Sequence, residues 1–156
     1  MKCSIGVKAY RLICNELSKF ENEETSGILL GYTNFDVVNI VMATDSGYIN
    51  VKHDYNFCEY DVDYQNHICN IISNLYPVPL RLIGVWHKHN YFSENPLSKT
   101  DIDVLKKYVI ETNGTCVSLL MQKINSEEYS MDVFYLKNNS DCISKFENIY
   151  FQKDRV

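Results

Sequence analysis

Residues Leu80 to His89 have the sequence LRLIGVWHKH, an apolar run that predicts a buried β-strand with polar residues at its end. Residues i and i+2 of a strand point to the same face and lie about 6.6 Å apart along the chain. His87 and His89 therefore share one face, and Lys88 points to the other. Two imidazoles placed in this way can reach one metal ion at about 2.1 Å each. Two polar residues at a strand end would give the same pattern without a metal.

A helix start follows these histidines after eight residues. The sequence Ser98-Lys99-Thr100-Asp101 opens a helix that the apolar spacing extends through Val109. Ser98 as N-cap and Asp101 as third helical residue form a capping arrangement, which stabilises a helix whether or not metal binds. Asp101 also projects from the first turn, where its carboxylate can be a third ligand. Two histidines and one carboxylate leave one coordination position for water, as in catalytic zinc sites.

The remaining segments predict one domain of mixed helix and sheet, a mixed α/β (α+β) fold. Apolar spacing predicts further helices over residues 10–20 and 62–75. β-rich runs predict strands over 28–30, 37–41, 48–54, 115–123 and 129–136, and the first two form a hairpin. Because no repeat or linker divides the sequence, we expect a single domain over residues 1–156, with its core over about 5–137 and a C-terminal tail over 138–156.

Composition excludes several classes of protein. The chain has 156 residues, 46% of them hydrophobic, and a formal net charge of −5, whereas nucleic-acid binders usually carry a basic surplus. No apolar run is long enough to span a bilayer, and the N-terminal residues become polar before a signal peptide could form. The six cysteines have no zinc-ribbon spacing, so we expect reduced, mostly buried thiols. These observations predict a cytoplasmic protein that binds neither nucleic acid nor membrane.

The spacing of the polar residues is similar to a known motif. His87-Lys88-His89, eight residues and then Ser98-x-x-Asp101 resemble the JAMM motif of the JAB/MPN metalloproteases. Those enzymes carry a glutamate upstream, ahead of a glycine-containing strand, and Glu24-Thr25-Ser26-Gly27 fits this element. Gly84-Val85-Trp86 is similar to bacterial stand-alone members. The resemblance covers most of the chain and implies an MPN-type fold, with a curved mixed β-sheet flanked by helices.

The resemblance also implies roles for individual residues. His87, His89 and Asp101 would hold one Zn²⁺ per chain. Glu24 would be the general acid/base, and Ser98 would help to hold the oxyanion of the tetrahedral intermediate besides capping its helix. The chemistry is consistent with these roles, because a carboxylate near a zinc site can accept a proton from water and return it to the leaving amine.

Five other positions were compared with the motif. Glu23 is an adjacent alternative for the general acid/base, although its spacing to the following glycine is less suitable. Lys88 and Asn90 depart from the family, which often has a small residue between the histidines and a proline after them. Neither position supplies a ligand, so we expect altered loop shape or substrate fit rather than loss of metal. His53 and His67 fall outside the motif and are expected to be structural or surface residues.

The activity implied by the resemblance is zinc-dependent cleavage of a peptide or isopeptide bond after the C-terminal glycine of a ubiquitin-like protein. That protein or its conjugate is the expected substrate. E1-like or E2-like enzymes encoded nearby are expected partners, as in bacterial anti-phage (CBASS-like) conjugation systems. Two alternatives stay open: processing of ThiS/MoaD-type sulfur-carrier proteins, and a non-catalytic MPN scaffold. Zinc nucleoside deaminases are disfavoured because their His-x-Glu and Pro-Cys-x-x-Cys motifs do not occur.

Overall fold

The computed structural model describes residues 1–49, 51–112 and 114–153. Over these residues the helices are α1 (Val7–Lys19), α2 (Val62–Leu75) and α3 (Lys99–Thr112). The strands are β1 (Lys2–Gly6), β2 (Ser26–Asn34), β3 (Val37–Ala43), β4 (Lys52–Asp54), β5 (Phe57–Glu59), β6 (Arg81–His89), β7 (Thr115–Lys123), β8 (Tyr129–Lys137), β9 (Ser144–Lys145) and β10 (Ile149–Gln152). The expected mixed α/β class is confirmed.

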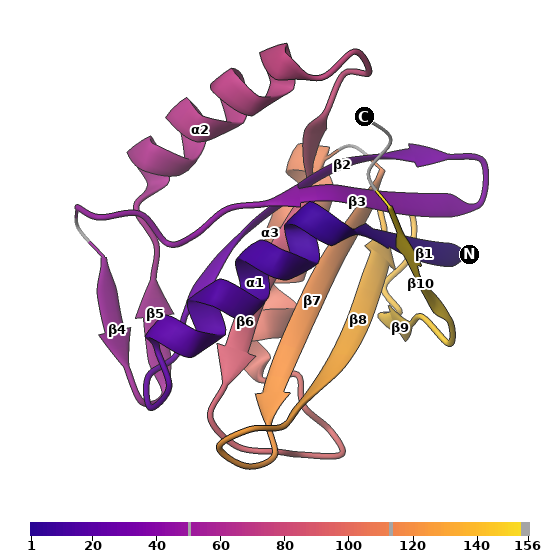
Figure 1. Ribbon diagram of the computed structural model, residues 1–156. Helices are drawn as coiled ribbons and strands as arrows, with labels where there is room; N and C mark the ends of the chain where they lie inside the picture. Colours follow the sequence, from indigo (N-terminus) through magenta and orange to yellow (C-terminus); the bar gives the residue numbers. More distant parts are fainter. Residues whose placement is uncertain (50, 113, 154–156) are drawn as a thin grey trace.

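One mixed sheet forms the centre of the molecule, with strand order β10-β1-β3-β2-β6-β7-β8-β9. The strand β6 lies in its middle, antiparallel to β2 and parallel to β7. The sheet twists so strongly that β2 and β3 run across the direction of β7 and β8 (Figure 1). The strands β4 and β5 form a separate hairpin beside it. Helix α1 covers one face of the sheet, and α3 lies against the other (Figure 1).

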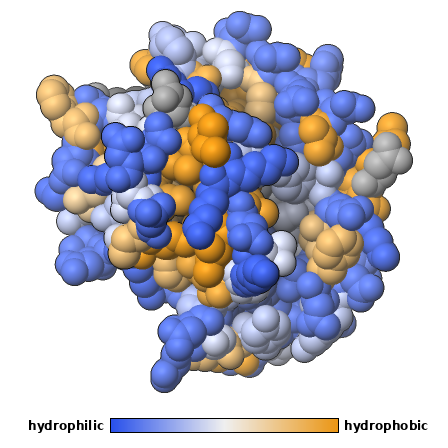
Figure 2. Space-filling model, turned by 180° about the vertical axis from the view of Figure 1, so that it is seen from behind, coloured by the Kyte–Doolittle hydropathy of each residue, from blue (hydrophilic) through white to orange (hydrophobic). Residues whose placement is uncertain are grey.

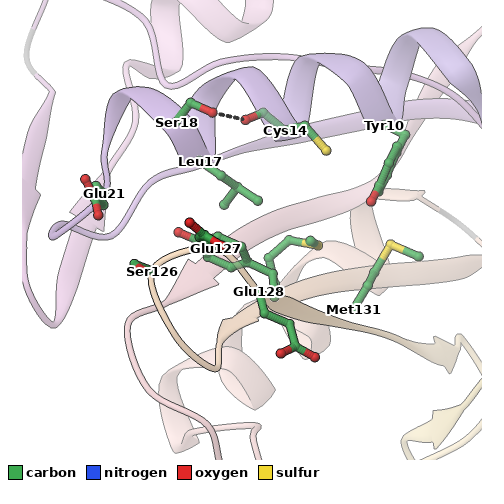
Figure 3. A pocket seen from close by; sticks show the side chains of 11 residues that line it. Tyr10, Cys14, Leu17, Ser18, Glu21, Ser126, Glu127, Glu128 and Met131 are labelled. Atoms are coloured by element: carbon green, nitrogen blue, oxygen red, sulfur yellow. Dashed lines mark hydrogen bonds between the residues drawn. The ribbon is translucent and has the colours of Figure 1, made fainter.

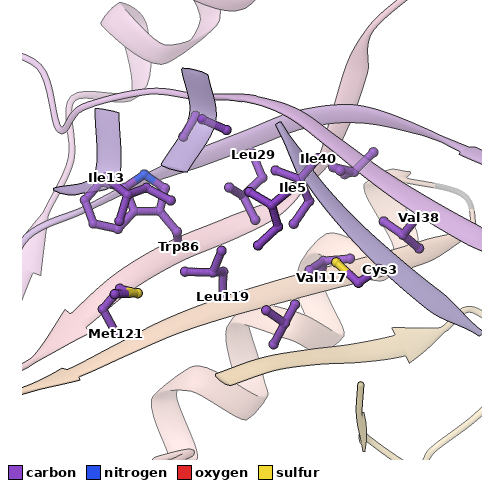
Figure 4. Close-up of a cluster of buried hydrophobic side chains, with 14 of the residues drawn as sticks. Cys3, Ile5, Ile13, Leu29, Val38, Ile40, Trp86, Val117, Leu119 and Met121 are labelled. Carbon is purple, nitrogen blue, oxygen red and sulfur yellow. The ribbon is translucent and has the colours of Figure 1, made fainter. Parts of the chain in front are cut away.

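The face under α1 holds the largest apolar cluster (Figure 4). Ile13 and Leu17, one helical turn apart on α1, are buried there with Trp86 of β6 and Leu119 of β7. The indole Nε1 of Trp86 donates a hydrogen bond to the carbonyl of Thr44 at 2.8 Å, which satisfies its polar group. Burial of each such apolar side chain contributes about 1.5–3 kcal/mol, so this cluster is a main source of stability.

The opposite face packs against α3 and α2. Leu105 and Val109 of α3 are buried against Cys116 of β7 and Leu136 of β8. Val85 of β6 belongs to a second cluster on this side, beside α2. Side chains alternate between the two faces along a strand, so those of His87 and His89, two and four residues after Val85, point to this same face. Viewed from behind, the surface shows hydrophobic groups divided by hydrophilic side chains (Figure 2).

One expected strand is shorter than the sequence predicts. Residues 48–54 were expected to be extended, but β4 covers only Lys52–Asp54 and pairs with β5 instead of the main sheet; residue 50 lies outside the described part of the chain. The chain leaves the sheet after β3 because its polar groups bond to α2: Gln65 donates to the carbonyl of Asp45, and the carbonyl of Ser46 accepts from the amide of Asp61. Gly47 then turns the chain at a φ of 92°.

The C-terminal segment, expected as a tail, is instead part of the fold. Phe146 is buried in the main core, and β10 pairs in parallel with β1, a strand that the sequence analysis also missed. The core therefore begins at Cys3 and reaches at least Phe146. Residues 154–156 of the expected tail lie outside the described part of the chain. Such short strands have little local signal, because their stability comes from pairing with distant segments.

Two further expectations concern exposure. Within the described chain, every helix is too short or too polar to cross a membrane. The six cysteines are free thiols in the structure, as expected. The expectation that most are buried is wrong, because only Cys3 and Cys116 are fully buried and Cys142 is exposed.

Candidate metal centre

The end of β6 places two imidazoles on the face that packs against α3. The Nε2 atoms of His87 and His89 lie 3.2 Å apart, and the rings are tilted by 69°. His89 is buried and His87 is half-buried. Their neighbours in the sheet fix the backbone: His87 pairs with Ser26 of β2, and His89 pairs with Gln122 of β7. The alternation of a strand thus brings both rings to one point, as the sequence predicts.

Asp101 reaches the same point from the first turn of α3. Its Oδ1 lies 3.0 Å from Nε2 of His87, and its Oδ2 lies 3.6 Å from Nε2 of His89. Ser98 holds this carboxylate: its backbone N–H and its hydroxyl each donate to Oδ2 at 2.7 Å. In return, the amide of Asp101 donates to Ser98 Oγ at 3.2 Å. The capping arrangement is therefore confirmed, and it orients the third candidate ligand.

The surroundings favour the forms of these side chains that bind metals. Burial and the neighbouring His87 lower the pKa of His89 to about 4, which keeps its ring neutral near pH 7. Burial acts to raise the pKa of Asp101, but hydrogen bonds from His87 and Ser98 outweigh it and hold that pKa well below its usual range. A neutral imidazole and an ionised carboxylate are the forms in which these groups coordinate a metal.

Glu24 lies beside this triad, at the residue where the chain enters β2. It is only 8% exposed, whereas Glu23 is exposed to solvent. Burial raises the pKa of the Glu24 carboxyl to about 7, although the charge of His87 lowers it and that of Asp101 raises it further. Such a carboxyl can both accept and release a proton near neutral pH. Of the two adjacent glutamates, Glu24 is therefore the one with an environment suited to acid/base chemistry.

The backbone of Glu24 is fixed on both sides. Its amide donates to the carbonyl of Asp54 at 2.7 Å, and its carbonyl lies 2.8 Å from Nδ1 of His53. The His53 ring stacks on Phe20 with 3.8 Å between centroids. His53 thus has a structural role, as expected, and His67 is exposed on α2. The β4–β5 hairpin, which carries His53 and Asp54, supports the residue proposed for proton transfer.

Comparisons with known proteins inform the fold. The chain matches no model of a known protein family and no curated protein sequence. Among solved structures, it is similar to the solution structure of protein DSY2949 from Desulfitobacterium hafniense, with a TM-score of 0.64 and 12% sequence identity. The match covers 97% of this chain and 94% of that one. At this level of identity, the similarity shows only that the two proteins share a fold.

The three candidate ligands fit a zinc ion. Their ligand atoms all lie within 4.8 Å of one another. In a tetrahedral site with bonds of about 2.0–2.1 Å, ligand atoms are about 3.3 Å apart, close to the 3.2 Å between the two Nε2 atoms and the 3.0 Å from Nε2 of His87 to Oδ1 of Asp101. The Nδ1 atom of His89 is buried without a hydrogen-bond partner among the described residues. Two imidazoles and one carboxylate, held by the sheet and a capped helix, form a donor set that zinc accepts.

Exposed aromatic side chains occur after the end of β6 and in the β4–β5 hairpin. Tyr91 stacks on His89 with 5.4 Å between ring centroids and is itself half exposed. Tyr55 and Phe57, at the turn and start of β5, are also exposed. Tyr55 is linked to the end of β6 because its carbonyl accepts a hydrogen bond from Asn90 at 2.7 Å. The ligands themselves are less exposed than these rings, with 15% of the His87 side chain, 6% of His89 and 12% of Asp101 accessible to solvent.

A cavity lies elsewhere, between α1 and the β7–β8 hairpin (Figure 3). It has a volume of about 660 Å³, with Leu17 and Met131 in its apolar wall and Glu127 and Glu128 near its opening. The metal ligands do not line it.

Sequence reasoning missed the roles of Lys88 and Asn90. Lys88 points away from the triad, as strand alternation predicts, and supplies no ligand. Both side chains are buried and donate hydrogen bonds to backbone carbonyls of segment 20–23, and Asn90 also donates to the carbonyl of Tyr55. A lysine in an otherwise apolar strand face was the available signal, because a buried ammonium requires partners.

Proposed function

We propose that the protein is a cytoplasmic zinc-dependent peptidase of the JAB/MPN type that cleaves after the C-terminal glycine of a ubiquitin-like protein. The observation that carries this proposal is the convergence of His87, His89 and Asp101 beside the buried carboxyl of Glu24. A scaffold that only binds partners has no need of this convergence. E1-like or E2-like enzymes that form the conjugate are the partners that this function implies.

Each residue has a distinct task in the proposed reaction. His87, His89 and Asp101 hold the ion, which when bound acts as a Lewis acid and lowers the pKa of a water ligand to about 7. Glu24 accepts one proton from the attacking water while the new C–O bond forms. It then delivers that proton to the amine nitrogen as the C–N bond breaks. The products are the glycine carboxylate and the free amine.

Ser98 stabilises the negative oxygen of the tetrahedral intermediate. In the structure its hydroxyl donates to Asp101, so this hydrogen must turn toward the oxyanion during the reaction. The bond that Ser98 Oγ accepts from the Asp101 amide does not use this hydrogen and can persist. Ser98 can therefore donate to the oxyanion and still cap helix α3.

The small exposed area of the ligands favours a slender, extended substrate that ends in glycine. A flexible tail can lie along exposed backbone, and glycine lets its own backbone approach a metal centre closely. The exposed ring of Tyr91, which stacks on His89, offers apolar contact for the substrate residues that follow the glycine. A larger side chain before the cleaved bond would hold that carbonyl away from the centre.

Two measurements test this function. Freshly purified protein should contain about one zinc per chain by elemental analysis, and His87→Ala, His89→Ala or Asp101→Ala should each greatly reduce it. His67→Ala is the matched control, because His67 is exposed on α2 and should leave the zinc content unchanged. Absence of zinc from the untreated protein would contradict the proposal.

The second measurement concerns the substrate. Ubiquitin-like fusions are made with Gly, Ala, Val or Leu before the cleaved bond, and the glycine fusion should be cleaved fastest. A ThiS/MoaD-type fusion in the same panel distinguishes the two classes of ubiquitin-like substrate. If fusions with all four residues are cleaved at equal rates, the protein is a general peptidase without specificity for a glycine tail. If the zinc-loaded protein cleaves none of these fusions, the result favours the alternative of a non-catalytic MPN scaffold.

A further inference from the structure

Lys88 is a fully buried lysine on the face of β6 opposite the metal ligands. Its ammonium carries three donors, and the structure gives it three acceptors, all backbone carbonyls. These belong to Phe20, to Glu21 at 2.9 Å and to Glu23 at 2.9 Å. The lysine is thus fully hydrogen-bonded by the segment that joins α1 to β2, the segment that ends at the proposed general acid/base.

This segment has no regular structure, yet every carbonyl from residue 20 to residue 24 has a side-chain partner. Besides the three bonds to Lys88, Asn90 donates to the carbonyl of residue 22 at 3.4 Å, and His53 lies against that of residue 24. Lys123 also donates to the carbonyl of residue 21 at 2.8 Å, from the surface. The segment follows the C-terminus of α1, where unpaired carbonyls attract a cation.

We infer that Lys88 is a positioning residue that fixes segment 20–24 and thereby holds the Glu24 carboxyl against the metal centre. The inference rests on the proposed function, because it assigns Lys88 a role through Glu24. The central strand β6 would then build the site from both of its faces. His87 and His89 hold the metal on one face, and Lys88 sets the proton-transferring group from the other.

Loss of the ammonium should affect the position of Glu24 and leave metal binding intact. Without Lys88, the three carbonyls lose the ammonium that holds them together, so the segment is expected to rearrange or open. The metal ligands lie on β6 and α3, outside segment 20–24, so we expect them to keep their positions. A displacement of about 1 Å of a reacting group can reduce a rate about 10²-fold.

The test compares Lys88→Met with Lys123→Met. Both remove a lysine that bonds to the carbonyl of Glu21, but Lys123 lies at the surface and makes only that bond to the segment. Hydrogen exchange measured by mass spectrometry should accelerate over residues 20–25 in Lys88→Met and stay near wild type in Lys123→Met. Zinc content should be unchanged in both. With a cleaved glycine fusion, Lys88→Met should lower kcat about 10²-fold with little change in KM.

Each outcome decides a separate question. Unchanged exchange over residues 20–25 would overturn the inference, whatever the activity. Faster exchange with an unchanged kcat, while Glu24→Gln is inactive, would also overturn it. If the zinc-loaded wild type cleaves nothing, the proposed function fails and the exchange measurement alone decides whether Lys88 fixes the segment. Lys88→Gln, with a shorter neutral side chain, replaces Lys88→Met in all these measurements if the methionine variant does not fold.

Discussion

At the scale of single residues, the Glu24 carboxyl separates proton transfer from metal binding. Glu24→Gln keeps the size of the side chain but cannot accept a proton. We expect zinc content and melting temperature near wild type and a loss of about 10⁴-fold in cleavage rate, the upper end for general acid/base catalysis. Glu23→Gln is the matched control and should remain active, because Glu23 is exposed. If Glu24→Gln is active and Glu23→Gln is inactive, Glu23 is the general acid/base instead of Glu24.

Ser98 combines a structural and a chemical role, and its replacement should show both. Ser98→Ala removes the helix cap and the hydroxyl that donates to Asp101. We expect a loss of about 1 kcal/mol in the free energy of unfolding and a smaller decrease in rate than for Glu24→Gln. Urea denaturation and cleavage assays measure the two effects. Thr100→Ala, an exposed change in the same helical turn, should alter neither.

The candidate ligands could be predicted from the sequence because local rules place them. Strand alternation brings His87 and His89 to one face, and the capping pattern of Ser98 marks Asp101 at a helix start. The partners of Lys88 and His53 could not be predicted in this way. They lie on segments far away in the chain, and their approach depends on how α1 and the β4–β5 hairpin pack beside β6.

At the scale of elements, Gly27 controls the spacing between strands at the site. A Cβ atom here would overlap the carbonyl oxygen of Thr44 and lie 2.6 Å from Nε1 of Trp86, disturbing the hydrogen bond between them. Because a backbone atom cannot move aside cheaply, Gly27→Ala should reduce the free energy of unfolding by about 3 kcal/mol. Urea denaturation measures this loss.

A matched glycine gives the control for that prediction. A Cβ on Gly114 would meet its nearest atom, the carbonyl oxygen of Thr112, at 3.8 Å, an ordinary contact. Gly114→Ala should therefore change stability by less than about 1 kcal/mol. Equal losses in the two variants would mean that crowding between β2 and β3 is not what requires glycine at residue 27.

The predictability of elements follows their length and local pattern. The strand at 115–123 and the helix at 62–75 agree with the sequence, since each has a sustained apolar period. The strands β1, β9 and β10 have two to five residues and were missed. Each depends on a partner distant in sequence, and β10 pairs with β1 across nearly the whole chain. Local propensity contains no information about such pairing.

At the scale of the whole molecule, the core is independent of the metal. The main cluster under α1 is built from apolar side chains on the face opposite the ligands. Removal of zinc with a chelator should therefore leave the far-UV circular dichroism spectrum unchanged. The melting temperature should fall by about 10 °C, the effect of losing a ligand present at several hundred times its Kd. If the protein unfolds when zinc is removed, the metal has a structural role.

The connection from residue 90 to residue 97 joins two ligand-bearing elements, each of which is also fixed by other parts of the sheet. The strand β6 is fixed by β2 and β7, and α3 is fixed by its apolar contacts with β7 and β8. Within this connection, the amide of Ser93 donates to the side chain of Gln122 at 2.9 Å. Insertions on either side of this attachment should be tolerated, because surface loops lengthen at small entropic cost. Changes in the length or sequence of this connection can therefore alter which substrates are accepted, while the residues that hold the metal stay the same.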